Sequence, residues 1–238
     1  MTPARPLAAR ILVVTGLRAE ARLVQGPDLG VVVGGGDPIA LAAAIRHELE
    51  RGARGLISFG MAGALAPAMR PGTLVVADAI CLPDGTRIAT DLRWSAALRA
   101  AMPDALSGAV AGSDTIVQGP PQKADLLART GALAVDMESQ VVARLAAAHG
   151  LPFTALRAIA DPAERSVPAA AMVAMRPGGG VDLQAFCRSL VRDPAQLPAL
   201  VRIALDARRA LATLARGRRL LGPGLGDTDL DQATLDVV

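Results

Sequence analysis

The sequence predicts an α/β fold in which helices cover both faces of a mostly parallel β-sheet. Short apolar runs alternate along the chain with segments of helical spacing, which is the order expected for a parallel sheet. Hydrophobic residues make up 52% of the chain but aromatic residues only 2%, which favours a large aliphatic core. The length of 238 residues suits one α/β domain, and no internal repeat is evident.

Seven apolar runs are expected to form buried strands, because each is short and bounded by turn residues. The first ends at Gly16, and the second runs into Gly34-Gly35-Gly36. Gly60-Met61-Ala62-Gly63 is expected to stop the third, and the fourth follows a Pro71-Gly72 turn. The expected strands are residues 11–15, 31–33, 55–59, 73–79, a strand beginning at 110–111, then 133–135 and 153–159.

Helices are expected between these runs, where apolar residues recur every three or four positions. The clearest one begins at Asp37-Pro38, which places an aspartate at the N-cap and a proline at the first helical position. A second signal follows the strand end at residues 135–139. The expected helical segments are residues 17–24, 38–51, 94–102, 123–129, 141–146, 183–191 and 196–215, and residues 166–181 are expected to form a loop.

Residues 1–221 are expected to form a single domain, followed by a flexible tail at 222–238. In the last helix, arginines stand beside leucines. This pattern is typical of a core-packing helix with solvated arginines, and it leaves open a basic surface that touches anionic lipid at the inner membrane. Cys81 and Cys187 lie far apart and no secretory signal core is recognisable, so we expect reduced thiols in a cytoplasmic protein.

The charge balance argues against nucleic acid as a partner. The formal net charge is only +3, and Lys123 is the one lysine among many arginines. The aromatic platforms on which bases stack are missing as well. His47 and His149 each lack a partner at ligand spacing, so no metal site is expected.

Three carboxylates, Glu20, Glu138 and Asp161, each follow the end of an expected strand. Ligands of open α/β sheets bind just beyond the carboxyl ends of strands. A carboxylate there can accept hydrogen bonds from both hydroxyls of a vicinal diol, and the thioether of Met137 provides a flexible apolar floor. Each acid also has a structural explanation, as a helix N-terminal charge or a turn cap. Three acids at one edge of a sheet favour a shared binding site.

Four motifs occur in a characteristic order: Gly16–Glu20, Gly60–Gly63, Val135–Ser139 and Ala160–Ala163. In this order and spacing, residues 10–215 resemble the nucleoside phosphorylase/nucleosidase superfamily, in its methylthioadenosine/S-adenosylhomocysteine nucleosidase branch. Residues 15–22, the Asp-Pro-Ala after the last strand, and Asp193–Pro198 also resemble the hopanoid-associated phosphorylases. The resemblance implies a three-layer α/β/α fold with a central mixed, mostly parallel sheet, and a homodimer.

The resemblance also implies roles for individual residues. Asp161 would act as general acid at adenine N7, and Glu20 would orient or deprotonate the nucleophile. Glu138 would hold the ribose 2′- and 3′-hydroxyls. The other implied site residues are Met137 against the sugar, Ile116 and Val117 beside the purine, and Ser58, Gly60 and Gly16 on the nucleophile side.

The sequence leaves open whether water or phosphate is the nucleophile. Phosphate-using members of the family carry an arginine and a serine around the Gly-x-x-Gly turn, where this chain has Ser58 and Met61. Neither is cationic and Met61 donates no hydrogen bond, which favours water. Arg18, Arg22 and the helix N-terminus after Gly34-Gly35-Gly36 remain alternative anion contacts.

The expected activity is cleavage of the N-glycosidic bond of a 5′-substituted adenosine, with release of adenine. By resemblance, the favoured substrate is lipid-tailed adenosylhopane of hopanoid biosynthesis. One alternative is a methylthioadenosine/S-adenosylhomocysteine nucleosidase, and another, from a different class, is a non-catalytic nucleoside-binding protein. No cofactor is expected, and phosphate remains open as a co-substrate.

Overall fold

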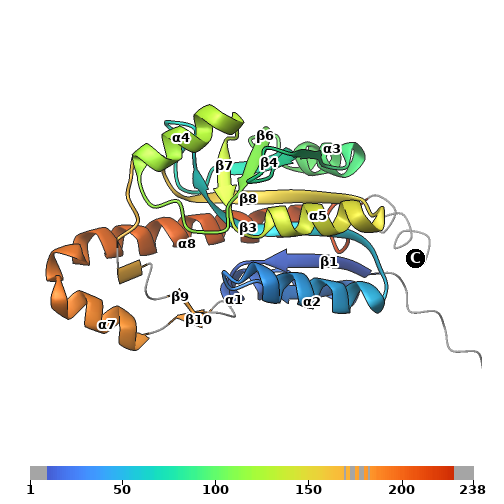
Figure 1. The fold of residues 1–238 in the computed structure, drawn as a ribbon. Coiled ribbons are helices and arrows are strands. Elements are labelled where there is room, and N and C mark those ends of the chain that lie inside the picture. The colour runs from blue at the N-terminus through green and yellow to red at the C-terminus, as the bar shows by residue number, and fades with distance from the viewer. Residues whose placement is uncertain (1–9, 169, 172–174, 177–179, 182, 228–238) are drawn as a thin grey trace, which may run out of the picture.

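A computed structural model describes residues 10–168, 170–171, 175–176, 180–181 and 183–227 (Figure 1). Helices pack on both sides of a mixed, mostly parallel sheet, so the expected fold class is confirmed. The strands of the main sheet are β1 (Arg10–Thr15), β2 (Leu29–Val33), β3 (Ala53–Ala64), β4 (Leu74–Cys81), β5 (Arg87–Ala89), β6 (Leu106–Gly112), β7 (Ala134–Asp136) and β8 (Phe153–Asp161).

The sheet is open at one end and closed at the other. β1 pairs with β2 and with β3, in both cases in parallel. From β3 the pairing continues through β8, β4, β6 and β7 and returns to β3, which makes a ring. The β3–β7, β4–β8 and β4–β5 pairs are antiparallel. β3 therefore joins the open part of the sheet to the ring.

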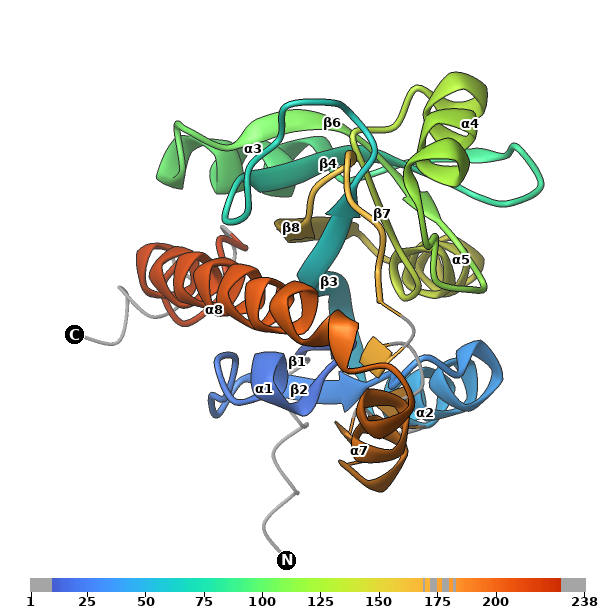
Figure 2. The same cartoon turned by 90° about the vertical axis from the view of Figure 1, so that its left-hand side faces the viewer.

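The helices form two layers with separate aliphatic cores (Figure 2). Along β1, Leu12 and Val14 point to the layer of α2 and α5, whereas Ile11 and Val13 point to the layer of α3 and α8, as the alternation of a strand requires. The helices are α1 (Arg18–Ala21), α2 (Pro38–Glu50), α3 (Leu92–Ala101), α4 (Pro120–Thr130), α5 (Ser139–His149), α7 (Leu183–Arg192) and α8 (Leu197–Leu220).

Several local expectations hold and others need correction. The Asp37 side chain accepts hydrogen bonds from the N–H groups of Ile39 and Ala40, as expected for the N-cap of α2. The helix expected at residues 17–24 has only the four residues of α1. Within the expected loop at 166–181, the described residues include a short hairpin of β9 (Met175–Arg176) and β10 (Gly180–Val181). A 3₁₀ turn (Pro194–Gln196) precedes α8.

The prediction that residues 60–63 stop the third strand is wrong. β3 continues to Ala64, and this part pairs with β8 on one side and β7 on the other. Gly60 provides space rather than a turn, because a Cβ there would lie 2.8 Å from both Arg157 Nη1 and Glu20 Oε2. The glycine lets two buried charged side chains approach the strand.

The packed chain extends beyond the expected boundary at residue 221. Leu225 is fully buried, and its carbonyl accepts a hydrogen bond from Trp94 Nε1 at 2.9 Å. Asp227 forms an ion pair with Arg54 at 2.8 Å. Residues 222–227 therefore belong to the folded body, because they pack against Trp94 and Leu98 of α3. The rest of the expected tail, residues 228–238, lies outside the described residues.

Replacement of Leu225 by alanine should lower the free energy of unfolding by about 2–5 kcal/mol, the usual cost of emptying a buried leucine site. Chemical denaturation measures this change. Leu220→Ala is the matched control, because Leu220 is 56% exposed. Equal effects of the two substitutions would contradict the packing of residues 222–227 on α3.

Candidate active site

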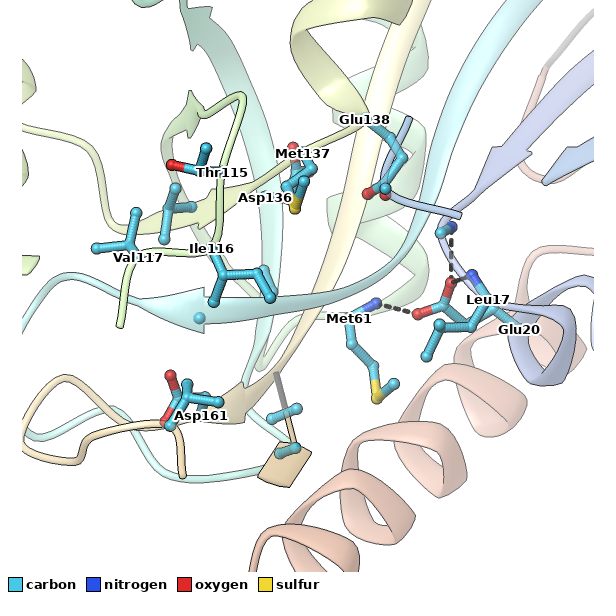
Figure 3. A pocket seen from close by; sticks show the side chains of 18 of the residues that line it. Leu17, Glu20, Met61, Thr115, Ile116, Val117, Asp136, Met137, Glu138 and Asp161 are labelled. Atoms are coloured by element: carbon cyan, nitrogen blue, oxygen red, sulfur yellow. Dashed lines mark hydrogen bonds between the residues drawn. The ribbon is translucent and has the colours of Figure 1, made fainter. Parts of the chain in front are cut away.

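A cavity of about 280 Å³ lies where β1, β7 and β8 end (Figure 3). This volume suits a small molecule rather than a macromolecule. Most of its lining is apolar, and four carboxylates from three segments line it. Its lining includes Gly16, Leu17, Glu20, Gly35, Met61, Ile116, Val117, Asp136, Met137, Glu138, Asp161 and Ile203.

Glu20 closes one end of the cavity. Its carboxylate turns back over the start of α1 and accepts hydrogen bonds from the N–H groups of Gly16 at 2.9 Å and Leu17 at 2.8 Å. The other oxygen accepts from the N–H of Met61 at 2.8 Å (Figure 3). Burial raises the pKa of Glu20, while these hydrogen bonds and Arg157 oppose the rise. Glu20 thus caps a helix and also presents a carboxylate at the cavity.

Glu138 forms the wall next to Glu20. It occupies the N-cap position of α5 but its side chain makes no capping hydrogen bond, so the helix does not account for its placement. Burial, opposed by Arg157 and reinforced by Asp136 and Glu20, raises the pKa of Glu138 to about 7. Gly16 makes room for it, because a Cβ there would lie 2.8 Å from Glu138 Oε1.

Arg157, which the sequence analysis missed, lies beneath these carboxylates in the middle of β8. Its side chain is fully buried, and its Nε forms an ion pair with Asp136. Nη2 lies 3.6 Å from Glu138 Oε2 and donates to Ser139 Oγ at 3.1 Å. A charged residue inside an apolar strand must find partners, because an isolated buried charge is very costly. That rule was the available signal for Arg157.

The Glu20 end of the cavity therefore holds more carboxylates than cations. Glu20, Asp136 and Glu138 surround Arg157, and three carboxylates against one guanidinium leave a formal charge of −2 when all are ionised. Their mutual repulsion and their burial both favour protonation of a carboxylate.

Asp161 lies at the end of β8, on the opposite side of the cavity from Glu20 (Figure 3). Oδ2 accepts a hydrogen bond from Lys123 Nζ at 2.6 Å. Burial raises the pKa of Asp161, and the hydrogen bond and charge of Lys123 oppose the rise. Ile116 and Val117, on the loop after β6, line the same cavity and give it an apolar wall (Figure 3).

Two expected nucleophile-side residues do not line the cavity. Ser58 is fully buried deeper in β3, where its hydroxyl bonds to Arg157 Nη2 and Ser139 Oγ. Gly60 lies against Arg157 and Glu20. Gly16 does line the cavity, and Met61 provides the side chain on this wall.

The alternative anion contacts expected from the sequence either lie away from the cavity or already have hydrogen-bond partners. Arg18 and Arg22 are exposed and do not line the cavity. The N–H groups of Gly34 and Gly35 bond to the carbonyls of Thr15 and Gly16, so they join the chain after β2 to the end of β1. At the N-terminus of α2, the carboxylate of Asp37 already accepts from two N–H groups.

Comparison with known proteins gives one family match. Residues 11–192 match the family model of the Phosphorylase superfamily. No curated protein sequence matches the chain.

Solved structures with a similar fold include nucleosidases. The 5′-methylthioadenosine/S-adenosylhomocysteine nucleosidase of Neisseria meningitidis, in complex with methylthio-immucillin-A, has a TM-score of 0.65 and 16% identity, over 90% of this chain and 98% of that one. The S-adenosylhomocysteine nucleosidase of Streptococcus pyogenes, in complex with 5-methylthiotubericidin, has 0.62 and 16%, over 92% and 100%. Futalosine hydrolase of Helicobacter pylori has 0.64 and 15%, over 90% and 97%. At these identities the likeness concerns the fold.

Stability should fall as the pH rises from about 4.5 to about 7, because Glu138 keeps its proton in the folded state up to about pH 7 but loses it near 4.5 when unfolded. The unfolded state then binds fewer protons, so folding is disfavoured across this interval. A rise of this pKa from 4.5 to about 7 corresponds to about 3 kcal/mol. The Glu138→Gln variant should show a flatter pH dependence in urea denaturation, whereas Glu50→Gln on the exposed end of α2 should keep the wild-type slope. An unchanged slope in Glu138→Gln would contradict this account.

Proposed function

Because the chain is an enzyme of the phosphorylase superfamily, we propose that it cleaves the N-glycosidic bond of a 5′-substituted adenosine and releases adenine. The observation that carries the proposal is the arrangement of Glu20, Glu138 and Asp161 around one cavity. Glu20 and Asp161 occupy opposite ends, and Glu138 lies on the wall between them. A nucleoside that spans the cavity would place its sugar at Glu138 and its base beside Asp161.

Cleavage of this bond creates positive charge on the ribose and negative charge on the departing base. Glu138 accepts hydrogen bonds from the 2′- and 3′-hydroxyls, and Met137 packs on the sugar. Glu20 takes the proton of the attacking water, while Asp161 gives its proton to adenine N7. Ile116 and Val117 flank the purine. The electron pair of the C1′–N9 bond leaves with adenine, and solvent later restores both carboxyl groups.

The raised pKa of Asp161 supports its role as the acid. An unperturbed aspartate, with a pKa of about 3.9, is only about 0.1% protonated at pH 7. Burial shifts the pKa of Asp161 upward, which increases the protonated fraction. A protein that only binds nucleosides has no need of a proton donor at N7, so this feature favours catalysis over the binding-protein alternative.

Water is the nucleophile that fits the site better than phosphate. The guanidinium of Arg157 is engaged by Asp136, Ser58 and Ser139, and the surrounding carboxylates outnumber it. Phosphate would have to compete with these partners for the guanidinium. Water needs only an acceptor for its proton, and Glu20 supplies one.

The favoured substrate within this class is adenosylhopane of hopanoid biosynthesis. The motif resemblance supports it, and so does the apolar wall formed by Leu17, Met61 and Ile203. This wall suits an uncharged 5′ substituent. Methylthioadenosine is the closer alternative, because its small methylthio group has the same apolar character.

A lipid-tailed substrate gives the outer face of α8 a function. Leu197, Val201 and Leu205 are about half exposed at intervals of four residues, and the exposed Arg202 and Arg208 lie beside them. Ile203 of the same helix lines the cavity. A cytoplasmic enzyme with this stripe can lie on the inner membrane next to its substrate. No described helix is long and apolar enough to cross a membrane.

We also propose that the protein is a homodimer, as the family resemblance implies, and light scattering tests this.

Purified protein should release adenine from 5′-substituted adenosines at equal rates with and without phosphate. Asp161→Asn should lower kcat by about 10²- to 10⁴-fold, the usual contribution of a general acid. If adenine release requires phosphate, the enzyme is a phosphorylase and not a hydrolase. Comparison of kcat/KM for methylthioadenosine, S-adenosylhomocysteine and adenosylhopane identifies the preferred substrate. If none of the three releases adenine, the alternative of a non-catalytic nucleoside-binding protein is favoured.

The protein should sediment with anionic liposomes at low salt and less so at high salt, because charged residues contribute to the contact. Replacing Val201 and Leu205 together by aspartate should abolish this binding. Leu92→Asp is the matched control, because Leu92 is 77% exposed but lies on α3. Failure of the wild-type protein to bind anionic vesicles at low salt would contradict the membrane contact.

A further inference from the structure

Lys123 is a buried cation that the proposed reaction has not used. It is the only lysine in the sequence, and its side chain on α4 is 1% exposed. All three N–H groups of its ammonium have acceptors: Asp161 Oδ2 at 2.6 Å, the Pro162 carbonyl at 2.8 Å and the Arg165 carbonyl at 2.9 Å. A buried ammonium with a full set of acceptors is a built site rather than a chance contact.

The three acceptors belong to one short segment, the end of β8 and the turn that follows it. Lys123 therefore links Asp161, at the end of β8, to α4. Because its ammonium engages Oδ2, the second oxygen of Asp161 is left for the cavity.

Lys123 is also the cation in direct contact with Asp161. The other charged groups that face Asp161 are Arg165 from its own loop and Asp206 from α8. Arg165 forms an ion pair with Asp206, which also accepts from Arg209 at 2.9 Å. The charge of Arg165 is thus largely balanced by Asp206, and Lys123 remains the main influence on Asp161.

We propose that Lys123 is a positioning residue that orients Asp161 and stabilises the carboxylate formed when Asp161 gives its proton to the leaving base. The inference rests on the proposed role of Asp161 as general acid. In this step the O–H bond of Asp161 breaks, the N7–H bond forms, and the C1′–N9 electron pair passes to adenine. Lys123 keeps its three protons and pairs with the negative charge left on Asp161.

Two opposing effects act on the pKa of Asp161. Burial raises the pKa of Asp161 and keeps a proton available, whereas Lys123 opposes the rise and makes the proton easier to release. A compact ammonium with three donors fits three converging acceptors, and the planar fork of arginine does not. This accounts for a lysine at this position in a chain that otherwise uses arginine.

The single lysine allows a direct test on the wild-type protein. After labelling with ¹⁵N-lysine, the side-chain ammonium should give one NMR signal in slow exchange with water. The signal should shift in Asp161→Asn, and it should also shift as Asp161 titrates in the wild type. A rapidly exchanging signal, or one that Asp161→Asn leaves unchanged, would overturn the contact. This measurement needs no turnover, so its failure is distinct from failure of adenine release.

Kinetics then test the function of the contact. Lys123→Met should lower kcat by about 10- to 100-fold, part of the usual contribution of a general acid. Because Asp161 must be protonated to act, loss of the cation should move the alkaline limb of the kcat profile upward by about 1–3 pH units. In an Asp161→Asn background, Lys123→Met should cause no further loss.

Arg129→Met is the matched control, because it removes a cation from the exposed side of the same helix. It should leave both kcat and the pH profile unchanged. An unshifted alkaline limb in Lys123→Met, or an equal loss in the Asp161→Asn background, would reduce Lys123 to a structural role and overturn the proposal.

Discussion

The ion pair between Arg157 and Asp136 holds the candidate site together. It lies inside the sheet, with Arg157 on β8 and Asp136 at the end of β7, and both side chains are almost completely buried. Glu20 and Glu138 interact electrostatically with the same guanidinium. Removal of one partner of such a buried pair typically costs about 3–5 kcal/mol, because the other charge is left without compensation. The carboxylates can therefore gather at the cavity because Arg157 lies beneath them.

Two glycines, which have no side chain, are as important to this arrangement as the charges. Gly16 and Gly60 lie where a Cβ would contact Glu138, Glu20 or Arg157 at 2.8 Å. Each end of the cavity also has a buried cation, Arg157 beside Glu20 and Glu138 and Lys123 beside Asp161. The cavity is thus polarised by two separate ion-pair systems, which can set the acidity of its two ends independently.

Much of the fold and the three acids could be predicted from the sequence, because strand ends, helix caps and turn residues are local signals. Glu20, Glu138 and Asp161 were located by their positions after strands, and the structure places all three at one cavity. The charged partners were missed because they depend on contacts between distant segments. Arg157 had one signal, a single charge inside an apolar strand, and Lys123 had another, a single lysine in an arginine-rich chain. Ser58 was misplaced because a motif does not tell how deep a residue lies along its strand.

The burial of Lys123 has a consequence for the outer surface. Since it is the only lysine, the surface of the described chain carries its side-chain cations as guanidinium groups, apart from histidine. Guanidinium stays charged up to about pH 12 and above, so this part of the surface charge is constant through the alkaline range in which an ordinary lysine surface discharges. Reagents that acylate lysine amines will likewise find no exposed target there, and a change in that behaviour would report that α4 has come away from the end of β8.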